Sequence, residues 1–184
     1  MKENVSVFLA EGFEEIEGLT VVDLLRRAEI EVTMVSIGEG LEICGAHGIK
    51  VLADTIFEGT NFEETSMLIL PGGIPGTPNL EKHEGLMALI KEFDKEKKKI
   101  AAICAAPGIL ARLGLLKDKE AISYPSVESE LCGAKVLREP VVVSGHLITS
   151  RAVGTAIDFA LKLIEILKDE ETAKRIAKAI VYKE

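Results

Sequence analysis

Cysteine is scarce in this sequence. The three cysteines, Cys44, Cys104 and Cys132, are odd in number and far apart. This argues against a disulfide framework and favours a reducing, cytoplasmic compartment. The sequence also contains no CxxC, HExxH or other clustered Cys/His spacing, so we expect no bound metal.

Positive charge and long apolar runs are also in short supply. The 22 lysines and arginines are outnumbered by 30 acidic residues, giving a net charge of -8, which argues against nucleic acid or an anionic membrane as partner. The longest apolar run, Ile100 to Ala111, is interrupted by Pro107 and Gly108 and is shorter than the roughly 20 residues of a spanning helix. The first residues, "MKENVSVFLAEG", place a charge beside the apolar part, so we expect no signal peptide.

Nucleotide-binding loops are missing as well. The glycine-rich stretch "LPGGIPGTPN" contains neither a G-K-[ST] phosphate loop nor a dinucleotide G-x-G-x-x-G, and we expect no cofactor. Gly72 and Gly73 permit a backbone bend with N–H groups exposed toward a ligand. The alternative is a turn that simply ends a strand.

What the sequence does contain is an alternation of apolar strands and amphipathic helices. With 184 residues, it predicts one α/β domain over residues 1–184, with a doubly wound, mostly parallel sheet, helices on both faces and a small inserted hairpin. The expected strands are Val5–Ala10, Glu31–Ile37, Met67–Pro71, Lys99–Cys104, a hairpin within Gly40–Asp54 and another within Pro140–Ser150. The expected helices are Glu14–Ala28, Asn79–Lys98 with Asn79 as N-cap, a short one from Ala105, Gly154–Asp169 and Asp169–Ile180.

In folds of this class, ligands bind beyond the carboxyl ends of the strands. Three segments then stand out: Glu11–Glu17, Pro71–Gly76 and Cys104–Pro107. Cys104 lies where a strand turns directly into a helix, so free N–H groups would surround its side chain, lower the thiol pKa and be able to hold an oxyanion. The alternative is a buried structural cysteine, a common environment for this residue.

Glu17 is the second candidate. In "EGFEEIEG", the other acids are explained as solvated residues at a helix start, whereas Glu17 is adjacent to the apolar helix face that includes Ile16 and Leu24. A carboxyl group pressed toward the sheet would be desolvated, and its pKa would rise. The alternative is a solvated acid like its neighbours.

Histidines could activate a nucleophile, and the chain has three. His83 and His146 are expected on the surface. His47, at the tip of the inserted hairpin, is the one that could approach a site. Cys44 and Cys132 are expected to be structural; the alternative for Cys44, on a strand edge, is a second redox-sensitive thiol.

The motifs "LAEGFEEIE", "LPGG", "AAICAAP" and "TSRAVGTAIDFAL", in this order, resemble the ThiJ/PfpI superfamily, in particular the branch with the Parkinsonism-associated stress protein and bacterial deglycase-chaperone proteins. The resemblance implies a flavodoxin-like fold, a homodimer, a Cys104 nucleophile, a Glu17 partner and backbone donors at Gly73 and Ala105. This sequence differs from the family pattern in two places. Ala105 stands where the peptidase branch has a histidine, and Tyr124 stands where the Parkinsonism-associated stress protein has a histidine.

Three functions follow from this resemblance. The first is action on reactive carbonyls, converting a 2-oxoaldehyde to a 2-hydroxy acid or removing early adducts from proteins, with Cys104 as nucleophile and Glu17 as proton shuttle. The second is a redox sensor or holdase chaperone that uses oxidation of Cys104 to a sulfinic acid. The third is an amidase or peptidase. Gly72, His47 and Tyr124 are the further residues expected to line the site.

Overall fold

The computed structural model describes residues 3–183 and is built around a seven-stranded sheet with the order β10-β11-β7-β6-β1-β2-β5. β10 pairs antiparallel with β11, and the other neighbours are parallel. The strands are β1 (Asn4–Leu9), β2 (Glu31–Ser36), β5 (Thr55–Ile56), β6 (Met67–Leu70), β7 (Lys99–Ile103), β10 (Val141–Ser144) and β11 (Leu147–Ser150).

Two short ribbons lie outside this sheet. One is the antiparallel pair β3 (Glu42–Cys44) and β4 (Lys50–Leu52), and the other is the parallel pair β8 (Glu120–Ala121) and β9 (Lys135–Val136). The β3–β4 pair is the inserted hairpin that the sequence predicts.

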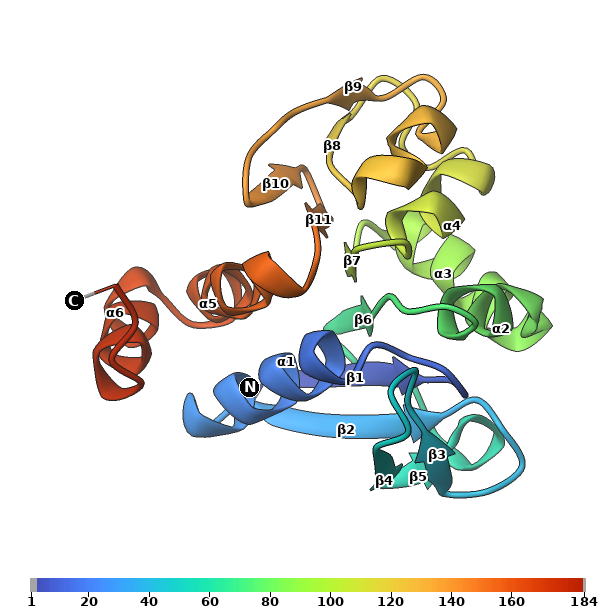
Figure 1. Cartoon of the computed structure of the whole chain (residues 1–184), viewed down its shortest axis with the longest axis horizontal. Helices are drawn as coiled ribbons and strands as arrows, with labels where there is room; N and C mark the ends of the chain where they lie inside the picture. Colours follow the sequence, from blue (N-terminus) through green and yellow to red (C-terminus); the bar gives the residue numbers. More distant parts are fainter. Residues whose placement is uncertain (1–2, 184) are drawn as a thin grey trace.

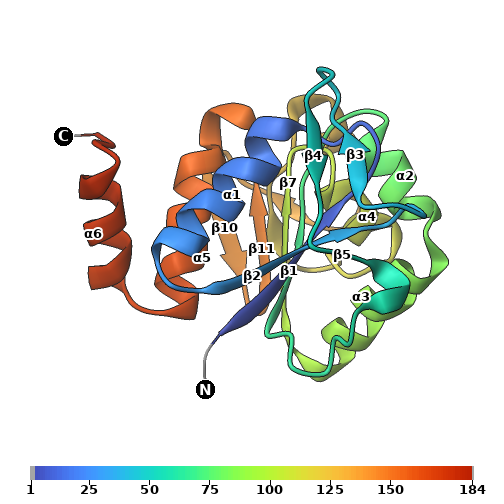
Figure 2. The same cartoon turned by 90° about the horizontal axis from the view of Figure 1, so that it is seen from below.

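Helices cover both faces of the sheet (Figures 1 and 2). They are α1 (Glu15–Arg27), α2 (Gly76–Lys82), α3 (Glu84–Glu96), α4 (Pro107–Arg112), α5 (Ala156–Leu167) and α6 (Glu170–Ala179), with 3-10 turns η1 (Phe57–Gly59), η2 (Pro125–Glu130) and η3 (Val153–Thr155). In the described part of the chain, none of these helices is both long enough and apolar enough to cross a bilayer.

The two layers follow from the alternation of side chains along the strands. In β1, Val7 and Leu9 pack with α1 and α5 on one face, and α6 lies against α5. Phe8 points to the opposite face and packs with α2, α3 and α4. This arrangement confirms the predicted doubly wound, mostly parallel α/β fold.

The predicted helix Asn79–Lys98 is in fact two helices. The chain breaks at His83, whose backbone is extended and whose Nδ1 accepts the Leu86 N–H at 3.0 Å, so His83 caps α3. Asn79 is not an N-cap: it lies within α2, and its Nδ2 donates to the Glu11 carbonyl at 2.9 Å. A histidine cap has no distinctive sequence pattern, which is why the break was missed.

The prediction that His83 and His146 lie on the surface is also wrong. The His146 side chain is only 8% exposed, and its Nε2 lies 2.7 Å from Asp94 Oδ1. The His83 side chain is half-buried against the ring of Phe57. Both histidines hold α3 in place.

Candidate active site

Three segments meet at the carboxyl ends of the adjacent strands β7, β6 and β1. Cys104 follows β7, the Gly72-Gly73 turn follows β6, and Glu17 lies in the first turn of α1 after β1. The structure therefore brings together the three segments that the sequence singled out. Gly72 shows how close they are: a Cβ built on it would lie 2.6 Å from Cys104 Cβ and 2.7 Å from Glu17 Oε2.

Cys104 has an unusual backbone conformation for a residue other than glycine. Its φ is +64°, in the left-handed region that L-residues rarely adopt. The turn is held from both sides, because the Cys104 N–H donates to the Ser150 carbonyl at 3.1 Å and the Cys104 carbonyl accepts the Tyr124 N–H at 2.7 Å. Strain of this kind, fixed by the surrounding structure, is typical of functional sites.

Glu17 is fully buried, with an exposure of 0%. Its Oε2 accepts the Gly72 N–H at 2.9 Å. Its Oε1 is buried without a hydrogen-bond partner among the described residues. The Cys104 thiol and the Val153 amide lower the pKa of the carboxyl group. An oxygen without a close donor is where a buried carboxyl group most readily keeps a proton.

Burial is the largest influence on the Cys104 thiol. Together with the negative charge of Glu17 and the hydrogen bond to it, burial raises the thiol pKa to about 12, while the amides of Ala105 and Gly73 act as donors that lower it. The prediction that the thiol pKa falls is therefore wrong when Glu17 is ionised. Gly73 and Ala105 are the donors that the resemblance implies, and burial and the neighbouring charge outweigh their effect on the thiol pKa.

Burial also raises the pKa of Glu17, to about 7, against the lowering effects of the Cys104 thiol and the Gly72 amide. Groups this close titrate as a pair rather than independently. The pair releases one proton near pH 7 and keeps the other far into the alkaline range. Moving the remaining proton from sulfur to Glu17 gives a thiolate beside a neutral acid, without any proton leaving the site.

A cavity of about 450 Å³ opens above the sulfur. Its lining combines the site groups with a largely apolar wall: Glu14, Glu17, Gly73, Ile74, Cys104, Ala105, Tyr124, Ser126, Val127, Ala152 and Val153. Tyr124 and Gly73 thus lie where the sequence expected them. The wall from Ala152 and Val153 was missed, because nothing in the local sequence shows that β11 ends beside β7.

His47 does not reach this cavity. Its Nδ1 lies 2.8 Å from Glu15 Oε2, its N–H donates to Glu15 Oε1 at 2.7 Å, and its side chain is 66% exposed. It lines a neighbouring hollow with Ile16, Ile49 and Val153 instead. Within one chain, the predicted approach of His47 to Cys104 is not observed.

The first turn of α1 is arranged opposite to its apolar pattern. Ile16, predicted on the buried face, is 53% exposed, whereas Glu15, predicted to be solvated, is buried. Glu15 is held by the hairpin tip, which supplies the His47 contacts and the Ile49 N–H at 3.4 Å. Glu14, also predicted to be solvated, lines the Cys104 cavity.

Glu14, Glu15 and His47 are also the group whose geometry could hold a cation, with ligand atoms within 4.8 Å of one another. A metal there would have to replace the His47–Glu15 hydrogen bond. No such group of residues includes Cys104 in the part of the chain that the structure describes.

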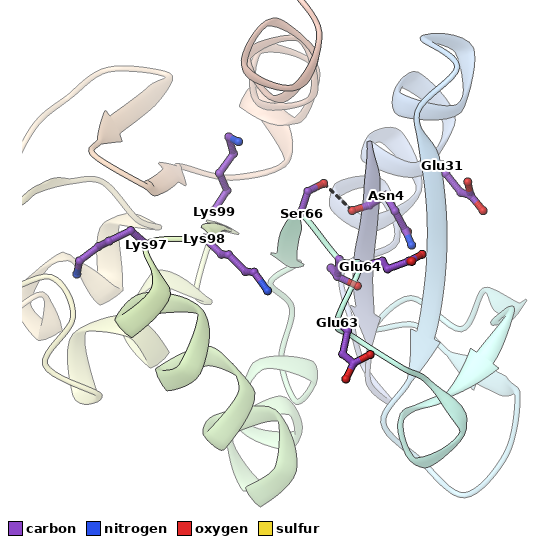
Figure 3. Close-up of a pocket in the computed structure, with 9 residues that line it drawn as sticks. Asn4, Glu31, Glu63, Glu64, Ser66, Lys97, Lys98 and Lys99 are labelled. Carbon is purple, nitrogen blue, oxygen red and sulfur yellow. Dashed lines mark hydrogen bonds between the residues drawn. The ribbon is translucent and has the colours of Figure 1, made fainter. Parts of the chain in front are cut away.

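A larger hollow, of about 720 Å³, lies at the opposite edge of the sheet (Figure 3). Lys97, Lys98 and Lys99 line it on one side, and Glu63 and Glu64 line it on the other. Its lining contains no thiol or histidine. The chemistry is therefore concentrated around Cys104, in the smaller cavity.

The chain is also similar to known proteins. The pattern of the DJ-1/PfpI family matches residues 3–166. A deglycase of Pyrococcus abyssi is 31% identical over 166 residues, which cover 89% of this chain and 99% of that protein. DJ-1 homolog B of Arabidopsis thaliana is 32% identical over 95% of this chain, which spans only 40% of that protein's length.

The fold has equally clear relatives among solved structures. Oxidized DJ-1 of Toxoplasma gondii superimposes with a TM-score of 0.95 at 35% identity, covering 99% of this chain and 100% of that one. The family match over most of the sequence and the shared fold lead to one conclusion: the chain belongs to the DJ-1/PfpI family.

Proposed function

We propose that this protein acts on reactive carbonyl compounds, with Cys104 as nucleophile and Glu17 as the group that takes and returns its proton. The observation that carries the proposal is the placement of a part-buried thiol next to a fully buried carboxyl group, in a cavity that Gly73 and Ala105 also line. The relative named a deglycase supports the same class of chemistry.

The reaction begins when the proton moves from the Cys104 sulfur to Glu17. The thiolate adds to the aldehyde carbon of a 2-oxoaldehyde, and the Gly73 and Ala105 N–H groups stabilise the alkoxide that forms. Glu17 then returns its proton to that oxygen, giving a hemithioacetal.

In the second half, the hydrogen on the former aldehyde carbon leaves as a proton to Glu17 and is returned to the adjacent carbon, while the hydroxyl proton passes from the former aldehyde oxygen to the former ketone oxygen, giving a thioester of a 2-hydroxy acid. Water hydrolyses the thioester and regenerates the thiol. The aldehyde carbon is oxidised while the neighbouring ketone is reduced, so the reaction as written requires no cofactor or external oxidant. An early adduct on a protein amine would first release the amine by collapse of its hemiaminal to the aldehyde, and that aldehyde would enter the same sequence.

Glu17 is the base in this scheme because the other two groups suit the role less well. Tyr124 lines the cavity, but a phenol is a poor base at neutral pH. His47 is bonded to Glu15, outside the cavity. An amidase or peptidase would need a Cys-His pair. Here Ala105 follows the cysteine, and His47 lies outside the cavity, so no such pair is formed among the described residues.

The test is to incubate purified protein with methylglyoxal and follow lactate. We expect Cys104→Ala to abolish lactate formation. Cys132→Ala removes an exposed cysteine away from the cavity lining and is the matched control, which should keep full activity. Wild-type protein that forms lactate no faster than Cys104→Ala would refute the proposal.

A second function, redox sensing, is favoured by one observation. A neutral Glu17 beside the sulfur can donate a hydrogen bond to a sulfinate, and the similar Toxoplasma gondii structure is described as oxidized. Mild peroxide should then add about 32 Da, two oxygens, to Cys104 and leave Cys44 and Cys132 unmodified. Oxidation spread equally over the three cysteines would contradict this function.

A further inference from the structure

The Cys104 cavity carries side-chain charge of one sign. Its lining includes the carboxyl groups of Glu14 and Glu17, and no lysine or arginine is among the lining residues in the described part of the chain. The positive potential available to a ligand comes from the amides of Gly73 and Ala105, which line the cavity and lower the pKa of the thiol. A charge elsewhere on the substrate would meet only acids.

Glu14 is firmly placed at this cavity. Its backbone N–H donates to the Gly72 carbonyl at 2.9 Å, which ties it to the turn beside Cys104. Its side chain is only 14% exposed, so solvent screens it less than a surface acid. The carboxylate also contributes to raising the pKa of Glu17 by charge repulsion, which shows that it acts across the site.

The nearby histidine does not cancel this charge. His47 Nδ1 lies 2.8 Å from Glu15 but 3.6 Å from Glu14. A protonated His47 would still face two carboxylates, and it lies outside the cavity lining. The mouth of the cavity therefore stays acidic whether or not His47 is charged.

The remaining wall favours apolar groups. Ile74, Tyr124, Val127 and Val153 form most of it. An aromatic or aliphatic substituent can pack there while the carbonyl carbon lies at the sulfur.

We propose that Glu14 determines specificity by charge: the site accepts carbonyl compounds whose remaining part is apolar and either uncharged or cationic, and it rejects anionic ones. This inference rests on the proposed function for its substrates. The selection of charge at Cys104 can nevertheless be measured without turnover.

The turnover test compares phenylglyoxal with 4-carboxyphenylglyoxal, which differ by one carboxylate. We expect kcat/KM to favour the neutral compound by about tenfold, the size of a partly screened repulsion between like charges. Glu14→Gln should bring the ratio close to one, and Glu14→Lys should reverse it. Glu171→Gln, which removes an exposed acid on α6, should leave the ratio unchanged.

The second test measures alkylation of Cys104 by neutral iodoacetamide and anionic iodoacetate, using peptide mass spectrometry. The exposed Cys132 in the same molecule gives the ratio of the two alkylation rates at a thiol outside the cavity. We expect the preference for iodoacetamide to be larger at Cys104 than at Cys132, and to shrink when salt is raised from about 0.05 to 0.5 M. This comparison in the wild-type protein needs no variant to fold.

The outcomes separate the two proposals. If neither glyoxal is converted but Cys104 still discriminates against iodoacetate, the carbonyl function fails and the charge selection stands. Equal kcat/KM values for the two glyoxals would overturn the charge selection even in an active enzyme. So would a ratio of iodoacetamide to iodoacetate alkylation rates that is the same at Cys104 as at Cys132.

Discussion

At the scale of single residues, the chemistry depends on which atom holds one proton. Cys104 is fixed in a left-handed backbone conformation, and Glu17 is buried beside it with one oxygen lacking a close donor. Burial raises the cost of ionising Glu17, and burial together with the Glu17 charge raises the cost of ionising the thiol, so the pair keeps a proton at neutral pH. A nucleophile and its acid are thereby held in one protonation state over a wide pH range.

Replacing Glu17 tests this arrangement. In the wild-type protein, the pair loses its first proton near the Glu17 pKa of about 7, so alkylation of Cys104 by iodoacetamide should rise with a midpoint near pH 7. In Glu17→Gln only the buried thiol titrates, and burial raises its pKa, so the midpoint should move to higher pH. An identical midpoint in both proteins would show that the two groups do not share a proton.

Gly72 offers a steric test at the same scale. A methyl group there would lie 2.6 Å from Cys104 Cβ and 3.1 Å from its sulfur. Gly72→Ala should therefore push the two site groups apart, slow Cys104 alkylation and lower the free energy of unfolding by about 1–3 kcal/mol.

Gly40→Ala is the matched control for Gly72→Ala, because a Cβ at Gly40 meets no atom within 4 Å. It should change the free energy of unfolding by less than about 0.5 kcal/mol. Denaturant titration and alkylation rates check both variants. Equal behaviour of the two would mean that the turn is looser than the structure shows.

At the scale of elements, the cavity wall formed by η2 depends on a side chain from α4. Arg112 binds Glu81 of α2 in a bidentate pair, with N···O distances of 2.6 and 2.9 Å, and also binds Glu130 at the end of η2. Tyr124 immediately precedes η2, and Ser126 and Val127 lie in it. One arginine thus connects α2, α4 and η2, and η2 is the one of these that lines the cavity.

Arg112→Ala should loosen that wall. These pairs are partly exposed, so the loss of overall stability should be only about 1 kcal/mol, but amide hydrogen exchange over residues 125–130 should become faster. Arg27→Ala breaks the exposed Arg27–Asp23 pair within α1 and should leave exchange in η2 unchanged. Unchanged exchange in Arg112→Ala would show that η2 is held by its other contacts.

Most elements were predictable because apolar periodicity is a local property. The strands before Cys104 and Gly72, and the helix that carries Glu17, were each expected within a few residues of their observed bounds. The exceptions occur where a side chain competes with the local pattern. His83 ends one helix and caps the next, and the hairpin tip buries Glu15 while Ile16 faces outward.

At the scale of the whole molecule, Glu17 couples the site to folding. Its pKa rises from 4.5 to about 7 on folding, so between these values the native state binds more protons than the unfolded state. The contribution of Glu17 to the free energy of unfolding is therefore fully present below about pH 4.5, and it is lost as the pH rises toward 7. The active protonation state is maintained at a cost in stability.

Comparing wild type with Glu17→Gln across this window isolates the effect. The wild-type free energy of unfolding should fall relative to the variant by about 3 kcal/mol between pH 4.5 and 7, at 1.36 kcal/mol for each unit of pKa shift. Urea titrations at several pH values measure it. A difference between the two proteins that stays constant with pH would show that Glu17 titrates normally in the folded state.

The sequence by itself determined the order of strands and helices, the parallel class of the sheet, and the three segments that end at its carboxyl edge, because these follow from local periodicity and from the direction of parallel strands. The tertiary structure decided the rest. It buried Glu15, placed a half-buried Glu14 at the cavity, kept His47 away from the sulfur, and reversed the predicted direction of the thiol pKa. These depend on desolvation and on charges from distant segments, which no local pattern records.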